Sequence, residues 1–157
     1  MDRLSDQDDS RSKNHCMKVT IRSFREAESD IRFVRDIVFG QEQNVAREVD
    51  WDGKDSQSIQ VVAIDGDDNP VGTGRMQPDG KIGRLAVLNS WRGQGIGQKM
   101  LRVLVETAEK KGFQEVFLHA QVHAISFYEK CRFHKDGEEF LEAGIPHVKM
   151  TRNISKI

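Results

Sequence analysis

The sequence predicts a single mixed α/β domain, and three observations carry that prediction. The chain has 157 residues, enough for one domain with a sizeable core. Hydrophobic residues make up 37% and charged residues 31% of it, as in a globular protein. Segments with a hydrophobic period of two alternate with segments of helical period. Their order is strand, helix, three strands, helix, strand, helix and two strands, which predicts a layered arrangement of a sheet and helices.

The first residues differ in composition from the rest. Residues 1–14 (MDRLSDQDDSRSKN) are polar and charged and are nearly free of apolar side chains. Such a segment cannot bury enough apolar surface to offset the entropy of ordering. We therefore expect a disordered tail at residues 1–14, followed by one domain over residues 15–157.

The first half of the domain is expected to contain a strand, a helix and three further strands. Alternating apolar residues predict a strand within residues 17–24, and apolar residues three and four apart predict a helix over 26–43. Ser23 or Ser29 is the expected helix cap. The polar stretch 47–56 predicts a loop in which Trp51 covers apolar surface. Three strands are predicted at 58–64, 71–76 and 81–88, the last two joined by the hairpin signal QPDG.

The second half is expected to contain two helices and three strands. After the glycines, one helical face is formed by Ile96, Met100, Leu101, Leu104 and Ala108. Lys110 and Lys111 suit the last turn of that helix, and Gly112 ends it. A buried strand follows at 115–120 and a short helix at 124–131. The segment 132–152 predicts two closing strands around EAGIP.

Composition and charge exclude several classes of protein. The formal net charge is −1, which argues against a nucleic-acid or membrane-surface partner. No apolar run approaches the roughly 18 residues of a membrane span, and no signal-like segment is apparent. Cys16 and Cys131 lack CxxC spacing, so reduced thiols and a cytoplasmic location are expected. His119 and His123 are too weak a pair to predict a metal site.

The stretch 85–101 (LAVLNSWRGQGIGQKML) places three glycines between a strand and a helix. It fails the dinucleotide fingerprint GxGxxG because Gln98 stands at the third small position, and it fails the P-loop pattern because Gln98 separates Gly97 from Lys99. What fits is RxxGxG, beginning at Arg92. A helix start offers unpaired N–H groups and partial positive charge, and glycines let an anion approach them. One glycine would suit a turn needed only for close packing; three with an arginine favour an anion site.

These residues resemble motif A of the GNAT superfamily of N-acetyltransferases, whose RxxGxG loop holds the pyrophosphate of acetyl-CoA. Residues 117–133 are similar to the next strand and helix of that family, with Tyr128 at the position of its characteristic tyrosine. Residues 38–55 and 140–150 resemble the ElaA-like bacterial branch. The resemblance implies a mostly antiparallel, splayed sheet flanked by helices. Arg132 departs from it, because many relatives have glycine there, and we expect an altered turn.

The resemblance also implies an activity and a cofactor site. Acetyl-CoA would donate its acetyl group directly to a primary amine of a small molecule or peptide, with no acyl-enzyme. A homodimer is implied only by what is usual in that family. The backbone of Leu85, Ala86 and Val87 would pair with the pantetheine arm, and Gln121 is a further candidate contact. The expected pyrophosphate site comprises Arg92, Gly93, Gln94, Gly95, Ile96, Gly97 and Gln98.

Tyr128 is the candidate general acid, because a phenol of pKa ~10 is protonated at neutral pH and can donate to a departing thiolate. Packing beside Phe127 is the alternative role. The candidates for the base that deprotonates the amine are Glu42, then His147, then Glu142. Ordinary solvated or paired side chains are the alternative for each. The acidic stretch 48–55 would suit a cationic acceptor.

Two other functions stay open on the sequence alone. A non-catalytic module that binds acyl-CoA and regulates a partner would use the same loop. A nucleotide-binding α/β protein is the third possibility, and in that case ATP would compete as strongly as CoA.

Overall fold

The computed structural model describes residues 17–155, so the tail predicted at residues 1–14 lies outside the described residues. In this part of the chain, eight strands form one sheet in the order β1-β2-β3-β4-β5-β8-β6, with β7 paired to β8. Only β4 and β5 are parallel neighbours, which confirms the mixed, mostly antiparallel sheet. The strands are β1 Lys18–Arg22, β2 Ile59–Ile64, β3 Pro70–Met76, β4 Lys81–Val87, β5 Glu115–Gln121, β6 His134–Lys135, β7 Phe140–Glu142 and β8 Ile145–Asn153.

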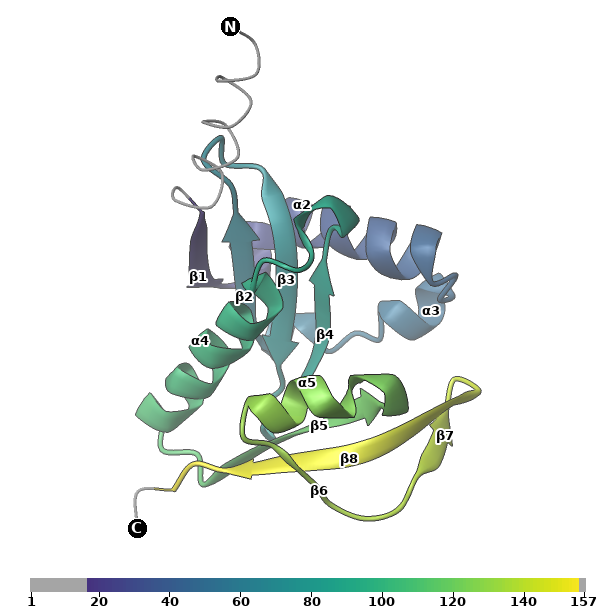
Figure 1. Ribbon diagram of the computed structural model, residues 1–157. Coiled ribbons are helices and arrows are strands. Elements are labelled where there is room, and N and C mark those ends of the chain that lie inside the picture. The colour runs from purple at the N-terminus through teal and green to yellow at the C-terminus, as the bar shows by residue number, and fades with distance from the viewer. Residues whose placement is uncertain (1–16, 156–157) are drawn as a thin grey trace, which may run out of the picture.

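Helices cover both faces of the sheet (Figure 1). Val61 and Ala63 of β2 belong to the core under α4, whereas Val62 belongs to the cluster under α2, so these two helices lie on opposite faces. The α-helices are α2 Phe24–Arg35, α3 Arg47–Asp50, α4 Ile96–Lys110 and α5 Ile125–Lys130. Short 3₁₀ turns occupy Asp55–Gln57, Asn89–Trp91 and Val122–Ala124.

The first helix begins at one of its two predicted caps. The Glu26 amide donates to the Ser23 hydroxyl at 3.2 Å, and the Glu26 carboxylate accepts from the Ser23 amide at 3.4 Å, which is a capping box. The helical segment then changes to a π-helix over Asp36–Glu42. The predicted helix is therefore confirmed in extent, but its last turns are wound differently.

Strands β4 and β5 start side by side and then separate. The register pairs only Lys81 with Phe117 and Ile82 with Leu118. Beyond them, β4 has no strand partner on that side within residues 17–155. Arg84 has φ 53° and lies where the register between β3 and β4 shifts, so a bulge bends β4 away. Figure 1 shows the result, with β4 running upright and β5 crossing below it. The expected splay of the sheet is confirmed.

The stretch predicted as a polar loop holds α3 and a buried ion network. Arg35 and Arg75 are each 1% exposed, and Asp50 and Asp55 are each 4% exposed. Arg35 bonds Asp55 at 2.6 Å and Asp50 at 2.8 Å, and Arg75 bonds Asp55 at 3.0 Å. Buried charges are tolerated only when paired in this way. The network joins α2 and β3 to the segment between them.

Two further residues connect this network to the bulge of β4. Arg84 lies 3.3 Å from the carboxylate of Asp52 and 3.4 Å from that of Asp50. Trp51 covers the guanidinium of Arg35 at 3.9 Å while also packing against the apolar cluster under α2. The acidic stretch is therefore used internally, and the expectation that it attracts a cationic acceptor is not supported by this geometry.

The main core lies between the sheet and α4, as the sequence predicts. The five residues of the predicted helical face are buried: Ile96, Met100, Leu101, Leu104 and Ala108. After α5 the chain turns at Arg132, which has φ 70°. The turn has the left-handed conformation that suits glycine, and Arg132 adopts it. No helix within residues 17–155 is both long and apolar enough to cross a bilayer.

Candidate active site

The N-terminus of α4 is bare. Gly95 is its N-cap with φ 83°, Gly93 has φ 77°, and among the described residues no side chain caps the helix. A Cβ atom at Gly93 or Gly95 would meet nothing within 4 Å, so packing does not explain these glycines. At Gly97 a Cβ would lie 3.7 Å from the Phe127 ring. The first N–H groups of α4 therefore face open space, as an anion site requires.

Arg92 and Glu42, predicted for different tasks, form an ion pair. Arg92 Nη2 lies 2.7 Å from Glu42 Oε2, and Arg92 Nε donates to the carbonyl of Val87 at 2.8 Å. Arg92 thereby joins the end of β4 to the end of the π-helix. The structure does not bring Glu42 together with the other two candidate bases, and its carboxylate is engaged at the loop.

The remaining predicted cofactor residues offer backbone rather than side chains. Leu85 packs against the main core, Ala86 is 3% exposed, and Ile96 is 3% exposed. Val87 is half-buried at the end of β4, where the strand has separated from β5. Gln94 and Gln98 are exposed at the start of α4. A ligand in the splay would meet main-chain groups of β4 and of the helix start.

Tyr128 packs among aromatic rings next to this helix start. Its ring lies 5.1 Å from that of Phe127 and 6.2 Å from that of Phe133, both in edge contacts. Burial, with a smaller contribution from Cys131, raises the pKa of Tyr128 to about 12. The phenol therefore stays protonated over the whole neutral and moderately alkaline range, so it can donate a hydrogen bond or a proton.

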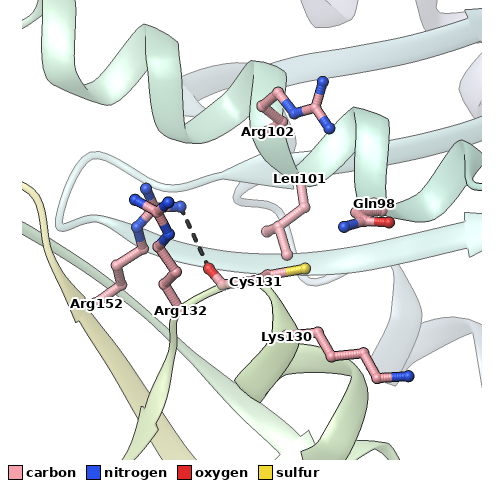
Figure 2. Close-up of a pocket in the computed structure, with 7 residues that line it drawn as sticks. All are labelled: Gln98, Leu101, Arg102, Lys130, Cys131, Arg132 and Arg152. Carbon is pink, nitrogen blue, oxygen red and sulfur yellow. Dashed lines mark hydrogen bonds between the residues drawn. The ribbon is translucent and has the colours of Figure 1, made fainter.

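A cavity of about 330 Å³ lies between α4, the end of α5 and β8 (Figure 2). Four cationic side chains line the cavity: Arg102, Lys130, Arg132 and Arg152. Within residues 17–155 no carboxylate forms an ion pair with any of them. Burial raises the pKa of the Cys131 thiol despite the weaker opposing effects of the Arg152 and Arg102 charges, so this thiol does not offset the positive charge. The lining residues are Gln98, Leu101, Arg102, Lys130, Cys131, Arg132 and Arg152.

Sequence reasoning missed this cavity. Its residues come from three elements far apart in the chain, and only Gln98 belongs to the predicted loop. One signal was present: Arg132 stands where a glycine is expected, and it retains the φ of 70° that glycine tolerates best. A strained backbone that carries a guanidinium into a basic cavity suggests that the charge has a use.

A second cluster lies on the face of β5 opposite α5. Gln121 pairs with His147 across β5 and β8, and His119 Nδ1 lies 2.9 Å from Glu142 Oε1. His147 Nε2 lies 3.7 Å from Glu142 Oε2. Two of the candidate bases therefore meet, although they are five residues apart on different strands. His123 instead contacts the Gln121 side chain at 2.8 Å, so the histidines of the weak metal pair have different partners.

Comparison with known proteins identifies the fold and family. The family model described as the acetyltransferase (GNAT) domain matches residues 37–154. A Bacillus subtilis protein, the uncharacterized N-acetyltransferase YjcF, is 38% identical over 141 residues, which is 87% of this chain and 100% of that protein.

Solved structures agree with the family match. The crystal structure of Escherichia coli ElaA superposes with a TM-score of 0.77 at 26% identity, covering 87% of this chain and 99% of that one. An acyl-CoA N-acyltransferase from Pseudomonas aeruginosa superposes with a TM-score of 0.76 at 27% identity, with the same coverage of 87% and 99%. The resemblance to the ElaA-like branch is thereby confirmed.

Proposed function

The chain belongs to the GNAT family of N-acetyltransferases, in its ElaA-like branch, and from this we propose that it transfers an acetyl group from acetyl-CoA to a primary amine. The observation that carries the proposal is the bare start of α4, which opens beside the free edge of β4. A diphosphate at the helix start and an extended amide chain along β4 would use both features at once.

The charges of CoA suit two neighbouring positive regions. Its diphosphate would accept from the N–H groups at Gly93 to Gln98 and from Arg92 Nη1, while Arg92 Nη2 stays paired with Glu42. Its 3′-phosphate would enter the cavity lined by Arg102, Lys130 and Arg132, which Gln98 joins to the helix start. A nucleotide without that phosphate would leave these cations unpaired. This supports acetyl-CoA over ATP as the ligand.

The proposed chemistry is direct transfer. The amine nitrogen forms a bond to the thioester carbon, the C–S bond breaks, and the thiolate takes a proton from the Tyr128 hydroxyl. A backbone N–H near Val87 would stabilise the oxyanion. The raised pKa of Tyr128, about 12, ensures that the proton is present before transfer. The second amine proton, passed through solvent, restores the phenol.

We assign the base to a candidate whose side chain is not already engaged in an ion pair at the glycine loop. Glu42 accepts a hydrogen bond from Arg92 at 2.7 Å, so we assign it to the loop, where its carboxylate would also contact a cationic acceptor. His147 and Glu142 lie together at the end of β5, and we assign deprotonation of the amine to this pair. The acceptor is then a small-molecule or peptide amine. A homodimer and a cytoplasmic location are further predictions.

The proposal is tested by measuring CoA released from acetyl-CoA in the presence of a panel of primary amines. We expect amine-dependent release, and we expect Tyr128→Phe to slow kcat by roughly 100-fold with little change in acetyl-CoA affinity. A regulatory module would bind acetyl-CoA and show no amine-dependent release. Absence of acetyl-CoA binding at millimolar concentration in calorimetry would remove the proposal altogether.

A further inference from the structure

Two histidines and one carboxylate converge on the face of β5 and β8 that points away from α5. Along β5, Leu118 and Ala120 enter the main core, so His119 between them faces the other side of the sheet. On β8, His147 lies opposite Gln121 and shares that face. Glu142 reaches both histidines from β7. The cluster lies at the end of β5, where the sheet has opened from β4.

The tautomer of His147 follows from its backbone contact. His147 Nδ1 lies 2.7 Å from the carbonyl oxygen of Ile145. A carbonyl only accepts hydrogen bonds, so Nδ1 must carry the proton and donate. In the neutral ring the lone pair is therefore on Nε2. That is the nitrogen that faces Glu142.

Among residues 17–155, no side chain donates a hydrogen bond to Nε2 of His147 or to Oε2 of Glu142. Nε2 of His147 and Oε2 of Glu142 are 3.7 Å apart, longer than an N–H···O hydrogen bond, and in the neutral ring both are acceptors. Two acceptors facing one another require a third group that donates to each. An ammonium group has three donors on one atom, so one group can satisfy both.

The neighbouring groups keep Glu142 charged and in position. His119 Nδ1 donates to its other oxygen, Oε1, at 2.9 Å. Burial opposes ionisation of Glu142, but the His119 hydrogen bond and nearby positive charge, including that of Lys81, outweigh it and lower the pKa of this carboxyl. Phe140 stacks on the His147 ring, with centroids 6.1 Å apart and planes 25° apart. The carboxylate is thus an anion with one oxygen free.

We infer that Glu142 and His147 form the seat of the acceptor ammonium group, with His147 Nε2 as the base that removes its proton. This rests on the proposed function. One N–H of the ammonium donates to Glu142 Oε2 and another to His147 Nε2. Transfer of the latter proton gives a neutral amine and an imidazolium, and the freed lone pair attacks the thioester. His119 acts as a positioning residue through Glu142.

The seat defines a substrate class. It takes an unhindered ammonium group with at least two N–H donors, as a primary ammonium has, because two N–H donors must fit between the imidazole and the carboxylate. A quaternary ammonium of equal charge has no donor and cannot make either bond. A carboxylate on the acceptor has no N–H or O–H donor at neutral pH and would not match two acceptors.

The first experiment needs no turnover. Ring nitrogens of ¹⁵N-histidine protein are observed at about pH 8, above the ordinary imidazole pKa of ~6.5, while butylamine is added. We expect His147 in the Nδ1–H form and a saturable shift of its Nε2 signal, with butyltrimethylammonium at least tenfold weaker. The shift should disappear in Glu142→Gln. Equal responses to both cations, no response to butylamine, or an Nε2–H ring would overturn the seat.

The second experiment measures transfer kinetics. His147→Asn keeps an amide donor for the Ile145 carbonyl but removes the base nitrogen, and we expect kcat to fall by roughly 100-fold or more at neutral pH. The loss should shrink as pH rises, and it should be smaller for weakly basic amines, because less deprotonation is then needed. A merely structural role would give the same loss at every pH.

Controls separate this inference from the function on which it rests. The matched control is His134→Asn, on exposed β6, which should retain the wild-type rate. His134→Asn and His147→Asn should both keep the wild-type affinity for acetyl-CoA. His119→Asn retains a donor for Glu142 and should change KM for the amine by less than Glu142→Gln does. Wild-type rates in His147→Asn would overturn the base alone. Wild-type protein that neither binds acetyl-CoA nor acetylates any amine would overturn the proposed function instead.

Discussion

Two groups of arginines in this protein differ in one respect. Arg35 and Arg75 are almost fully buried, and both bond carboxylates within residues 50–55 at 3.0 Å or less. Arg102, Arg132 and Arg152 line an open cavity, and no carboxylate in residues 17–155 pairs with them. Both groups concentrate positive charge. Only the first is neutralised by the chain itself.

The difference separates structural charges from charges available to a ligand. Taking a guanidinium out of water costs several kcal/mol, so Arg35 is stable in the interior only because Asp50 and Asp55 surround it. Cations held near one another at a cavity repel each other, and solvent and salt reduce this repulsion energy without removing it. A phosphate bound among them would offset the repulsion. The paired cluster therefore holds β4 in place, and the unpaired cluster is where we propose that an anion binds.

The largest effect is expected from breaking the paired group. Arg35→Met leaves two buried carboxylates without their main partner, and we expect the free energy of unfolding to fall by about 3–5 kcal/mol. Arg102→Met in the unpaired group should change it by less than about 0.5 kcal/mol. Denaturant unfolding followed by Trp fluorescence measures both. Similar losses in the two variants would show that the groups do not differ as described.

The next effect concerns ligand binding by the unpaired group. The double variant Arg102→Gln/Lys130→Gln should weaken CoA binding by about 2 kcal/mol, roughly 30-fold, since charge-assisted hydrogen bonds are lost. Its affinity for 3′-dephospho-CoA should hardly change. Calorimetric titration of both ligands gives the comparison. If the variant lost affinity for the two ligands equally, the cavity would not be the 3′-phosphate site.

A smaller effect is expected at the start of α4. Gly97→Ala adds a methyl group where the nearest atoms are 3.7 and 3.9 Å away, so the fold accommodates it. Alanine favours a helix over glycine by about 1 kcal/mol, so stability should rise. The same methyl group lies at the helix start, so acetyl-CoA affinity should fall by about 1 kcal/mol, roughly fivefold. Stability and affinity moving in the same direction would argue against an anion at this helix start.

The smallest effect is a dependence of stability on pH. Desolvation opposes ionisation of Asp52, but hydrogen bonds from Arg75 and Lys54 and nearby arginine charges lower its pKa well below the ordinary 3.8. A lowered pKa contributes stability above 3.8, and that stability is lost as pH falls below this value. Asp52→Asn should therefore be less stable at pH 7, by less than about 1 kcal/mol. The difference from wild type should shrink steadily as pH falls below 3.8; a constant difference would contradict the ion-pair origin.

The order and type of the main elements could be predicted because they depend on local spacing. The face of α4 from Ile96 to Ala108 and the alternation in β5 each reflect burial against one surface. The glycines of the loop were informative for the same reason, because a bare helix start is a local property. These predictions concern neighbours in the sequence.

The paired network could not be predicted, because pairing depends on contacts between distant segments. Asp50 and Asp55 look like solvated loop residues until α2 brings Arg35 beside both of them and β3 brings Arg75 beside Asp55. The basic cavity has the same difficulty, since Arg102 and Arg152 are fifty residues apart. The His147–Glu142 pair became visible only with the register of β7 and β8. A polar residue alone in a sequence does not reveal its partner.

The most direct measurement is a crystal structure of the protein grown with CoA. The account predicts diphosphate oxygens within hydrogen-bonding distance of the N–H groups at the start of α4, the pantetheine arm along β4, and the 3′-phosphate among the cavity cations. A helix start that is empty at saturating CoA, or a diphosphate bound elsewhere on the molecule, would contradict it.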